Sequence, residues 1–189
     1  MSPDNLRHHR RSIRLPEYDY SQEGAYFVTI CTQDRKCIFG EIVNGKMVLN
    51  EWGQIVDDEI IKTETLHPGV IIDTYGIMPN HVHLIILLCG DAGQGRDMAR
   101  HVPTGKRPFG KPQPGSLSAI AGSIKSAVTK NINLKRSVPG GSVWQSRFFE
   151  HVIRNQKSYG NIRQYIIENP FYWDQDEENP ERKTHKEIK

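Results

Sequence analysis

One short run, YGIMPNHVHLIILL at residues 75–88, constrains the fold of this chain more than any other feature. Its final part, residues 84–88, is apolar at every position, and a strand that is apolar on both faces is typical of a sheet centre covered on both sides. Pro79 cannot donate a ladder hydrogen bond, so the strand is predicted to begin after it, at about His81. The run therefore predicts a buried central strand.

Two histidines, His81 and His83, alternate along this predicted strand. Successive side chains of a strand point to opposite faces, so the two imidazoles are predicted to project together from one face. Imidazoles are the commonest metal ligands in proteins, and burying two of them side by side without partners is costly. A metal site is one interpretation, and a pair of hydrogen-bonded structural histidines at a strand end is the other.

Strand and helix patterns alternate along the rest of the chain. Asn50 and Ser116 are placed to cap helices, and Asn44-Gly45 favours a hairpin turn. The predicted strands are 25–32, 142–155 and the two arms of a hairpin within 37–50, and the predicted helices are 51–66, one that follows Ser116, and 158–169. This order predicts an α+β fold, a ferredoxin-like sandwich whose central antiparallel sheet has helices packed on it and the histidine pair on a central strand.

The net charge of +3 hides an uneven distribution of charged residues. Residues 1–14 hold four arginines against one acid, and residues 90–136 hold nine lysines and arginines against two acids. Acidic residues gather instead in 51–64 and from Asp174 onwards. Such segregation suits a surface that binds a polyanion, because neutralised phosphates supply affinity without regard to sequence. Ordinary solvation of loops and of one helix face is the alternative.

Length and composition exclude several classes of protein. The 189 residues, 37% of them hydrophobic, fit one domain with tails or at most two very small ones. No apolar stretch is long enough to cross a bilayer, and the N-terminus has no apolar core of a secretory signal. The three cysteines, Cys31, Cys37 and Cys89, lack the spacing of a zinc site or a disulfide framework. We expect a cytoplasmic protein with no membrane partner.

The last predicted helix carries a second pair of polar residues. Tyr165 and Asn169 are four residues apart and therefore lie one above the other, beside the apolar stripe of Tyr159, Ile162 and Ile166. A tyrosine at the margin of a packed helix can present its hydroxyl to a groove. The alternative is an ordinary amphipathic tyrosine whose hydroxyl is hydrated.

Several stretches, in the same order, resemble one family of proteins. They are RRSIRLPEYDYSQEGAYFVTICT, GEIVNGKMVLNEWGQIV, YGIMPNHVHLII and FFEHVIRNQKSYGNIRQYIIENP, and together they cover most of residues 10–170. The combination of MPNHVH with YIxxNP about eighty residues later is the most specific part. The chain resembles the REP-associated tyrosine transposases, a branch of the single-tyrosine HUH transposases of bacteria. The following stretch, FYWDQDEEN, departs from the small and basic residues that many relatives have there.

The resemblance implies a set of site residues. In that family the HxH histidines hold a divalent metal, the tyrosine of YIxxNP is the nucleophile, and the amide side chain four residues on completes the metal site. These positions are His81, His83, Tyr165 and Asn169. Two imidazoles and an amide oxygen suit Mg²⁺ or Mn²⁺. A phenol has a pKa near 10, so it needs a nearby cation or base to attack at neutral pH.

The resemblance also implies a nucleic-acid partner. That partner is a single-stranded DNA hairpin of the repetitive extragenic palindrome (REP) type, and the protein acts as a monomer or a homodimer and is nucleoid-associated when bound to DNA. A cation beside a stacking ring suits single-strand recognition, and lysines suit the hairpin backbone. The candidate DNA-binding residues are Arg10, Arg11, Arg14, Tyr18, Tyr20, Lys125 and Lys130.

These interpretations divide the chain into three parts. Residues 1–24 are a basic DNA-binding arm, 25–173 a single-tyrosine HUH catalytic domain with a flexible basic loop at 90–115, and 174–189 a charged tail expected to be disordered or peripheral. The implied activity is that of a metal-dependent single-strand DNA endonuclease and strand transferase with a covalent 5′-phosphotyrosine intermediate. A non-catalytic binding module for nucleic-acid hairpins is the alternative. A hydrolase of small phosphoesters is disfavoured by the basic surface.

Overall fold

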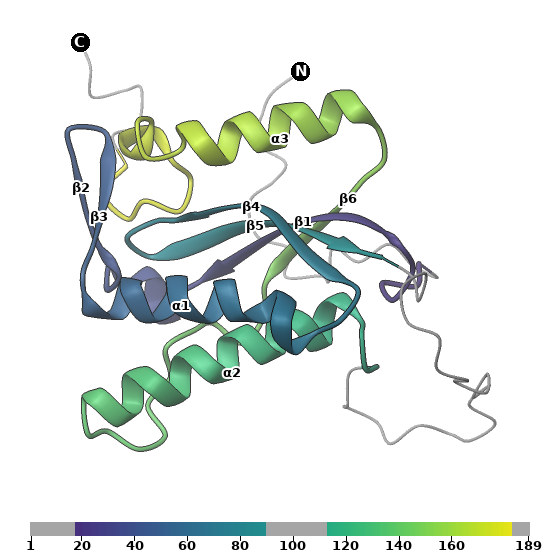
Figure 1. Cartoon of the computed structure of the whole chain (residues 1–189). Helices are drawn as coiled ribbons and strands as arrows, with labels where there is room; N and C mark the ends of the chain where they lie inside the picture. The colour runs from purple at the N-terminus through teal and green to yellow at the C-terminus, as the bar shows by residue number, and fades with distance from the viewer. Residues whose placement is uncertain (1–17, 90–112, 183–189) are drawn as a thin grey trace, which may run out of the picture.

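A four-stranded antiparallel sheet forms the centre of the computed structural model, which describes residues 18–89 and 113–182. The strand order is β4-β5-β1-β6, and every neighbouring pair is antiparallel. The predicted α+β sandwich is confirmed, with the histidine strand in the interior of the sheet (Figure 1). The strands of this sheet are β1 (Gly24–Cys31), β4 (Val70–Ile77), β5 (His81–Leu88) and β6 (Phe149–Ile153).

Helices cover the two faces of the sheet unequally. Two helices, α1 (Glu51–Leu66) and α2 (Leu117–Lys135), pack together on one face, and α3 (Gln156–Glu168) crosses the other (Figure 1). The larger apolar core lies under α1 and α2. A much smaller cluster of buried residues lies under α3, formed by Ile85, Ile153 and Ile166.

Local sequence signals explain where several elements begin. The Asn50 side chain accepts hydrogen bonds from the backbone N–H groups of Trp52 and Gly53 and so caps α1 at the predicted position. The hairpin of β2 (Gly40–Val43) and β3 (Lys46–Leu49) turns at Asn44 and Gly45, which both have positive φ. Ser116 caps α2 through the N–H of Ala119, again as predicted.

The histidine strand begins where the proline ends the preceding segment. β5 starts at His81, and all of its residues except Leu87 are buried, as expected for a central strand covered on both faces. The Pro79 carbonyl accepts hydrogen bonds from the N–H groups of Ile38 and Phe39. These bonds hold the turn before β5 against the segment that precedes β2. The backbone that carries the histidines is therefore held in place at the start of β5.

Two predicted boundaries differ from the structure. Only Phe149–Ile153 of the predicted strand 142–155 is a strand, because the preceding residues leave the sheet after a single bridge between Thr32 and Trp144. The last helix begins at Gln156 instead of residue 158, since Asn155 accepts from the N–H of Ser158 and caps it. No helix within the described residues is long and apolar enough to span a membrane. All three cysteines are free.

Candidate active site

A row of four paired residues crosses the sheet on the face that α3 covers. Gly76 of β4 pairs with His83 of β5, His83 pairs with Thr29 of β1, and Thr29 pairs with Phe149 of β6. A Cβ atom on Gly76 would lie 3.0 Å from Cγ2 of Ile166 and 3.2 Å from its carbonyl oxygen. Only a glycine therefore lets α3 approach the sheet this closely, and Tyr165 is the residue before Ile166.

The two histidines meet through their outer ring nitrogens. His81 is fully buried and His83 is 3% exposed, and their Nε2 atoms lie 2.9 Å apart. Burial lowers the pKa of His81 to about 3, with a further contribution from Arg35. Burial and the neighbouring ring of His81 also lower the pKa of His83. Both imidazoles are therefore neutral at physiological pH, which is the form that binds metals.

Hydrogen bonds behind the histidines orient the rings. The Asn80 amide nitrogen donates to the carbonyl oxygens of Arg35 and Glu178, at 3.0 and 2.7 Å, which leaves its Oδ1 facing Nδ1 of His81 at 2.8 Å. His81 Nδ1 must therefore be the protonated nitrogen, and its Nε2 presents a lone pair towards Nε2 of His83. Thr29 Oγ1 lies 2.8 Å from Nδ1 of His83 and can serve that ring in either tautomer.

Tyr165 and Asn169 of the α3 end face the histidine pair. The Tyr165 hydroxyl lies 3.3 Å from Nε2 of His83 and 3.5 Å from Oδ2 of Asp176. Asn169 is 2% exposed, and its Nδ2 donates to the same Asp176 oxygen at 2.6 Å. Its Oδ1 is buried without a hydrogen-bond partner. The structure thus brings together all four residues of the predicted centre and leaves one oxygen there unsatisfied.

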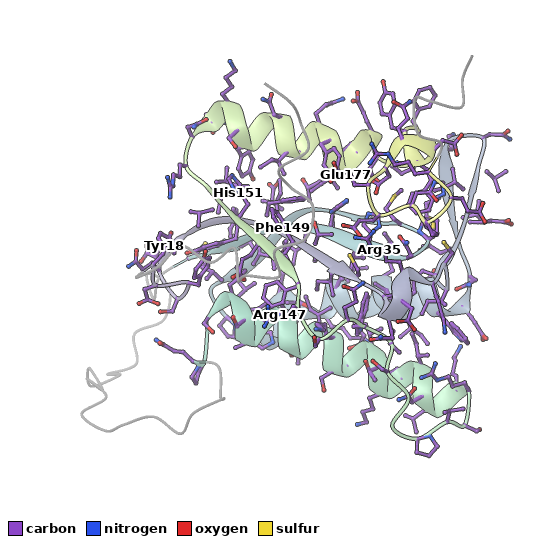
Figure 2. All side chains as sticks on the ribbon, turned by 180° about the vertical axis from the view of Figure 1, so that it is seen from behind. Tyr18, Arg35, Arg147, Phe149, His151 and Glu177 are labelled. Carbon is purple, nitrogen blue, oxygen red and sulfur yellow. The ribbon has the colours of Figure 1, made fainter. Side chains whose placement is uncertain are left out.

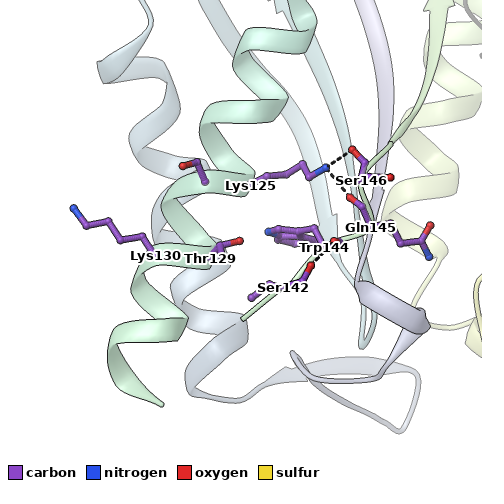
Figure 3. Close-up of a pocket in the computed structure, with 9 residues that line it drawn as sticks. Lys125, Thr129, Lys130, Ser142, Trp144, Gln145 and Ser146 are labelled. Carbon is purple, nitrogen blue, oxygen red and sulfur yellow. Dashed lines mark hydrogen bonds between the residues drawn. The ribbon is translucent and has the colours of Figure 1, made fainter. Parts of the chain in front are cut away.

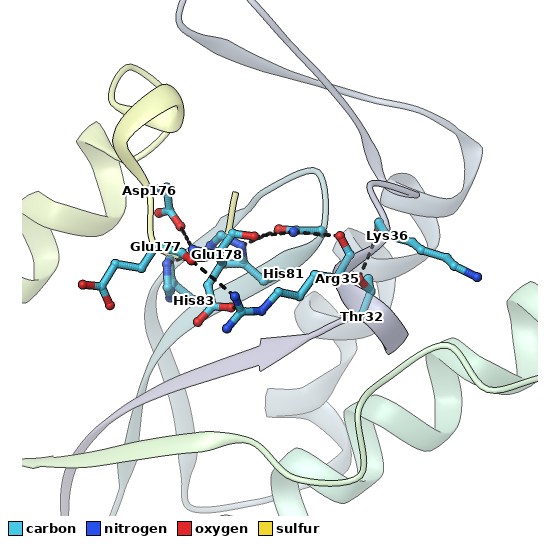
Figure 4. Close-up of polar contacts among 9 residues, drawn as sticks. Thr32, Arg35, Lys36, His81, His83, Asp176, Glu177 and Glu178 are labelled. Atoms are coloured by element: carbon cyan, nitrogen blue, oxygen red, sulfur yellow. Dashed lines mark hydrogen bonds and ion pairs between the residues drawn. The ribbon is translucent and has the colours of Figure 1, made fainter. Parts of the chain in front are cut away.

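Asp176 is a site residue that the sequence did not reveal. It was expected to lie in a disordered or peripheral tail, but it is 7% exposed and accepts from the N–H of Glu178 as well as from Asn169 and Tyr165. Residues 173–179, which we call the C-terminal segment, therefore fold back over the histidines (Figure 4). An aperiodic acidic stretch gave no sign of this. The aromatic Trp173, whose ring lies 6.1 Å from that of His81, was the one available hint of packing.

An ion pair helps to hold the C-terminal segment in place. Arg35 Nε lies 2.9 Å from a carboxylate oxygen of Glu178 (Figure 4). The amide of Asn80 holds the Glu178 carbonyl from the other side. The expectation of a disordered or peripheral tail is thus corrected for residues 174–182, whereas 183–189 lie outside the described residues.

The donor atoms fit a divalent cation. One atom each from His81, His83 and Asp176 lies within 4.8 Å of the others, and all three side chains are buried. Two nitrogens bound to one ion at about 2.1 Å and at a right angle would lie roughly 3.0 Å apart, close to the spacing of the two Nε2 atoms. The unsatisfied Oδ1 of Asn169 is a further oxygen donor. A mixed set of nitrogen and oxygen donors suits Mn²⁺ or Mg²⁺.

The phenol of Tyr165 is held in its protonated form. The residue is 45% exposed, but partial burial of the hydroxyl raises its pKa, and the carboxylates of Asp176, Glu177 and Glu178 raise it further. A neutral phenol is a poor nucleophile, so the arrangement requires either a cation beside the hydroxyl or a base for its proton. The nearest basic atom is Nε2 of His83, at 3.3 Å, and the carboxylate of Asp176 follows at 3.5 Å.

The candidate DNA-binding residues are distributed over several places. Arg10, Arg11 and Arg14 lie outside the described residues. Tyr20 is 8% exposed and packs in the larger core, with its ring 4.9 Å from that of Tyr18, and its stacking on DNA stays a prediction. Tyr18 is half-buried, and its hydroxyl lies 3.4 Å from that of Tyr26.

The two candidate lysines lie on α2, on the other face of the sheet from the histidines (Figure 1). Lys125 Nζ donates to the carbonyl oxygens of Gln145 and Ser146 at 2.7 and 3.1 Å, and burial lowers its pKa (Figure 3). Lys125 therefore holds the chain before β6, which leaves it less free to contact DNA than predicted. Both lysines line a hollow of about 440 Å³, and Lys130 is exposed at its rim.

Comparisons with known proteins identify relatives of the chain. No family model matches it. An uncharacterized protein of Haemophilus influenzae is 39% identical over 173 residues, covering 90% of this chain and 93% of that protein. The REP-associated tyrosine transposase of Escherichia coli is 27% identical over 151 residues, covering 80% of this chain and 68% of that protein. The structure of a REP-associated tyrosine transposase bound to a REP hairpin superposes with a TM-score of 0.53 at 25% identity, covering 84% of this chain and 73% of that one.

The residues that carried the sequence resemblance are those that the fold gathers at the α3 face of the sheet, and the fold itself matches the solved transposase. Sequence and structure agree on one conclusion: the chain is similar, in sequence and in fold, to the REP-associated tyrosine transposases.

Proposed function

We propose that this chain is a metal-dependent single-strand DNA endonuclease and strand transferase with Tyr165 as its nucleophile. One observation carries the proposal: the Tyr165 hydroxyl lies 3.3 Å from a ring nitrogen of a buried, neutral histidine pair. A phenol in that position stands beside the only described cluster of histidine and carboxylate groups that could hold a metal. The placement supports attack on a phosphodiester at this point.

The metal in this proposal is Mg²⁺ or Mn²⁺, bound by His81 and His83 through Nε2 and by Asn169 through Oδ1, with Asp176 as a further oxygen donor within reach. When bound, the ion would neutralise charge on the phosphate and favour the phenolate form of the nucleophile. Asn80 and Thr29 support the two rings from behind. Such outer partners usually matter for metal affinity almost as much as the ligands do.

The cleavage step needs only a nucleophile, a leaving group and a place for one proton. The Tyr165 oxygen attacks phosphorus, the bond from phosphorus to the 3′ oxygen breaks, and the 5′ phosphate stays on the tyrosine as an ester. Asp176 Oδ2, 3.5 Å from the hydroxyl, accepts the phenol proton and then gives it to the departing 3′ oxygen, which becomes a hydroxyl. The ester preserves the bond energy, so a second 3′ hydroxyl can reverse the step and rejoin the strand.

The substrate in this proposal is a single-stranded DNA hairpin of the REP type, since a related transposase has been solved with a REP hairpin. The basic N-terminal residues Arg10, Arg11 and Arg14 and the exposed Lys130 are the proposed contacts to its backbone. Residues 25–173 form the catalytic domain, to which the C-terminal segment contributes Asp176.

A covalent adduct is the decisive observation. The chain would be incubated with Mn²⁺ and end-labelled single-stranded hairpins made from palindromic repeats of its own genome, each with a randomised single-stranded foot. We expect a labelled protein band that survives denaturation and disappears in Tyr165→Phe. Tyr159→Phe is the matched control, because Tyr159 lies on the same helix two turns earlier and should leave the adduct intact.

The outcomes separate the alternatives. Hairpin binding without any adduct would make the chain a binding module. An adduct that persists in Tyr165→Phe would move the nucleophile to another residue and overturn the assignment of Tyr165.

A further inference from the structure

The α3 face of the sheet is only half covered. α3 packs against β4 and β5, whereas β1 and β6 carry side chains on the same face that solvent reaches, among them Phe27, Phe149 and His151. Phe149 is 39% exposed, His151 is exposed and Phe27 is half-buried. We call these three residues the β6 shelf. Figure 2 shows Phe149 and His151 along β6, with Arg147 just before the strand.

The β6 shelf is in ring contact with the candidate active site. The Phe27 ring stacks on the His83 ring with centroids 5.3 Å apart and meets the Tyr165 ring edge-on at 6.2 Å. The Phe149 ring in turn lies 6.2 Å from that of Phe27. An aromatic surface therefore runs from the nucleophile and a candidate metal ligand outwards to an exposed ring.

A hollow of about 340 Å³ lies beside this exposed ring, along the outer edge of the sheet. Its lining includes Phe149, His151, Arg154 and Asn155, the residue that caps α3. Its volume is at the lower end of the range for small-ligand sites, roughly 300–1,000 Å³. β6 is an edge strand, and such a strand presents unpaired backbone donors and acceptors to whatever lies beside it.

The two ends of the site differ in charge and in access. At one end the C-terminal segment covers the histidines and carries the acids Asp174, Glu177 and Glu178. At the other end the exposed basic residues Arg147 and Arg154 stand before and after β6. The one acid within β6, Glu150, lines the hollow but is buried and alternates to the other face of the strand from Phe149 and His151. A polyanion that reaches Tyr165 is repelled at the first end and attracted at the second.

We propose that the β6 shelf binds a nucleobase of single-stranded DNA, the base next to the scissile phosphate, by stacking it on Phe149. This inference rests on the proposed function, because it assigns a place to the strand that Tyr165 cuts. The stacked base positions the phosphate over the Tyr165 hydroxyl, and Arg147 and Arg154 hold the phosphates on either side. Stacking tolerates any base, so Phe149 is a positioning residue and does not read sequence.

Binding to a plain single strand tests the shelf independently of cleavage. The full chain with Tyr165→Phe would be titrated into a fluorescent oligothymidine and into an abasic oligomer of the same length, with anisotropy as the readout. We expect tighter binding of the oligothymidine. Adding Phe149→Leu, which keeps an apolar side chain against Phe27, should lower the ratio of the two affinities about tenfold. Phe149→Tyr should restore the ratio.

Phe171→Leu is the matched control, because Phe171 is 72% exposed and belongs to no part of the β6 shelf. It should leave the preference unchanged. An equal preference for bases in Phe149→Leu and its parent overturns the shelf. An adduct missing from the wild type while the Phe149 dependence holds would instead overturn the nuclease and leave the stacking site standing.

Cleavage then locates the stacked base. A single abasic position would be moved along the foot of the hairpin that gives the most adduct. Adduct formation by the wild type should slow most when the abasic position is next to the scissile bond. Phe149→Leu should be insensitive to an abasic position there. A maximum effect at a more distant nucleotide would contradict the assigned position.

Discussion

The two faces of the central sheet do different jobs, and the contrast explains how a small protein can keep so many polar groups buried. Under α1 and α2 the face is an apolar core that contains fully buried residues such as Ile60 and Ile120. Under α3 the apolar cluster has three buried members, and the rest of the space holds imidazoles, an amide, a carboxylate and a phenol. Stability comes mainly from the first face. The second face is therefore free to be polar and half open.

Removing the Asp176 carboxylate should have the largest effect on the polar face. At saturating Mn²⁺ the Nε2 atom of His83 would be bound to the metal, so in Asp176→Asn no nearby group is left to accept the phenol proton. We therefore expect adduct formation to slow by about 10²–10⁴-fold. Asp174→Asn, an exposed acid in the same segment, should leave the rate unchanged. Single-turnover kinetics with a labelled hairpin give the measurement.

Whether Asp176→Asn slows or accelerates adduct formation distinguishes two roles of the carboxylate. Asp176 also raises the pKa of Tyr165, so its loss brings that pKa closer to the ordinary phenol value. A faster reaction in Asp176→Asn would show that the carboxylate mainly restrains the phenol, and the role of proton acceptor would fall.

The close approach of α3 at Gly76 gives the next largest effect. In Gly76→Ala the new Cβ would meet Ile166 at 3.0 Å and push α3 away from the sheet. We expect a loss of about 1–3 kcal/mol in the free energy of unfolding. The rate of adduct formation should fall by up to about 10²-fold, the cost of a displacement of about 1 Å at the nucleophile. Chemical denaturation and the adduct assay together measure both effects. An unchanged rate would show that the contact between Gly76 and Ile166 does not affect catalysis.

The support behind the histidines should act on metal affinity more than on the fold. Thr29→Val removes the hydroxyl beside Nδ1 of His83 and keeps the shape of the side chain. We expect Mn²⁺ affinity to fall by roughly 10–100-fold in calorimetric titration. Thr63→Val is the matched control on the other side of the sheet, since Thr63 is also buried and its hydroxyl bonds only a carbonyl within α1. Equal affinity in the two variants would remove Thr29 from the metal site.

The sequence predicted the parts of the molecule that depend on local signals. The cap at Asn50, the turn at Asn44-Gly45 and the strand that begins at His81 all follow from single residues with strong preferences, and the structure has each of them. The resemblance added the grouping of His81 and His83 with Tyr165 and Asn169, which periodicity alone left open.

What the sequence missed depends on contacts between distant segments. Asp176 joins the site because Arg35 and Asn80 hold the residues that follow it, and no periodic pattern encodes such a contact. Tyr20 packs in the core although its neighbours are polar. Lys125 donates to backbone carbonyls of a connection some twenty residues later, a contact that its place on a polar helix face did not indicate.

The smallest expected effect belongs to the apolar face, at a glycine within α2. Gly122 is exposed, and a Cβ atom added there would meet nothing within 4 Å, unlike one at Gly76. Gly122→Ala should therefore raise the free energy of unfolding by about 0.5–1 kcal/mol, the difference in helix propensity between the two residues. Because α2 lies across the sheet from Tyr165, the rate of adduct formation and the affinity for Mn²⁺ should stay as they are. A stabilised variant with a changed rate would show that the two faces are coupled. It would contradict the view that one face supplies stability and the other the reaction.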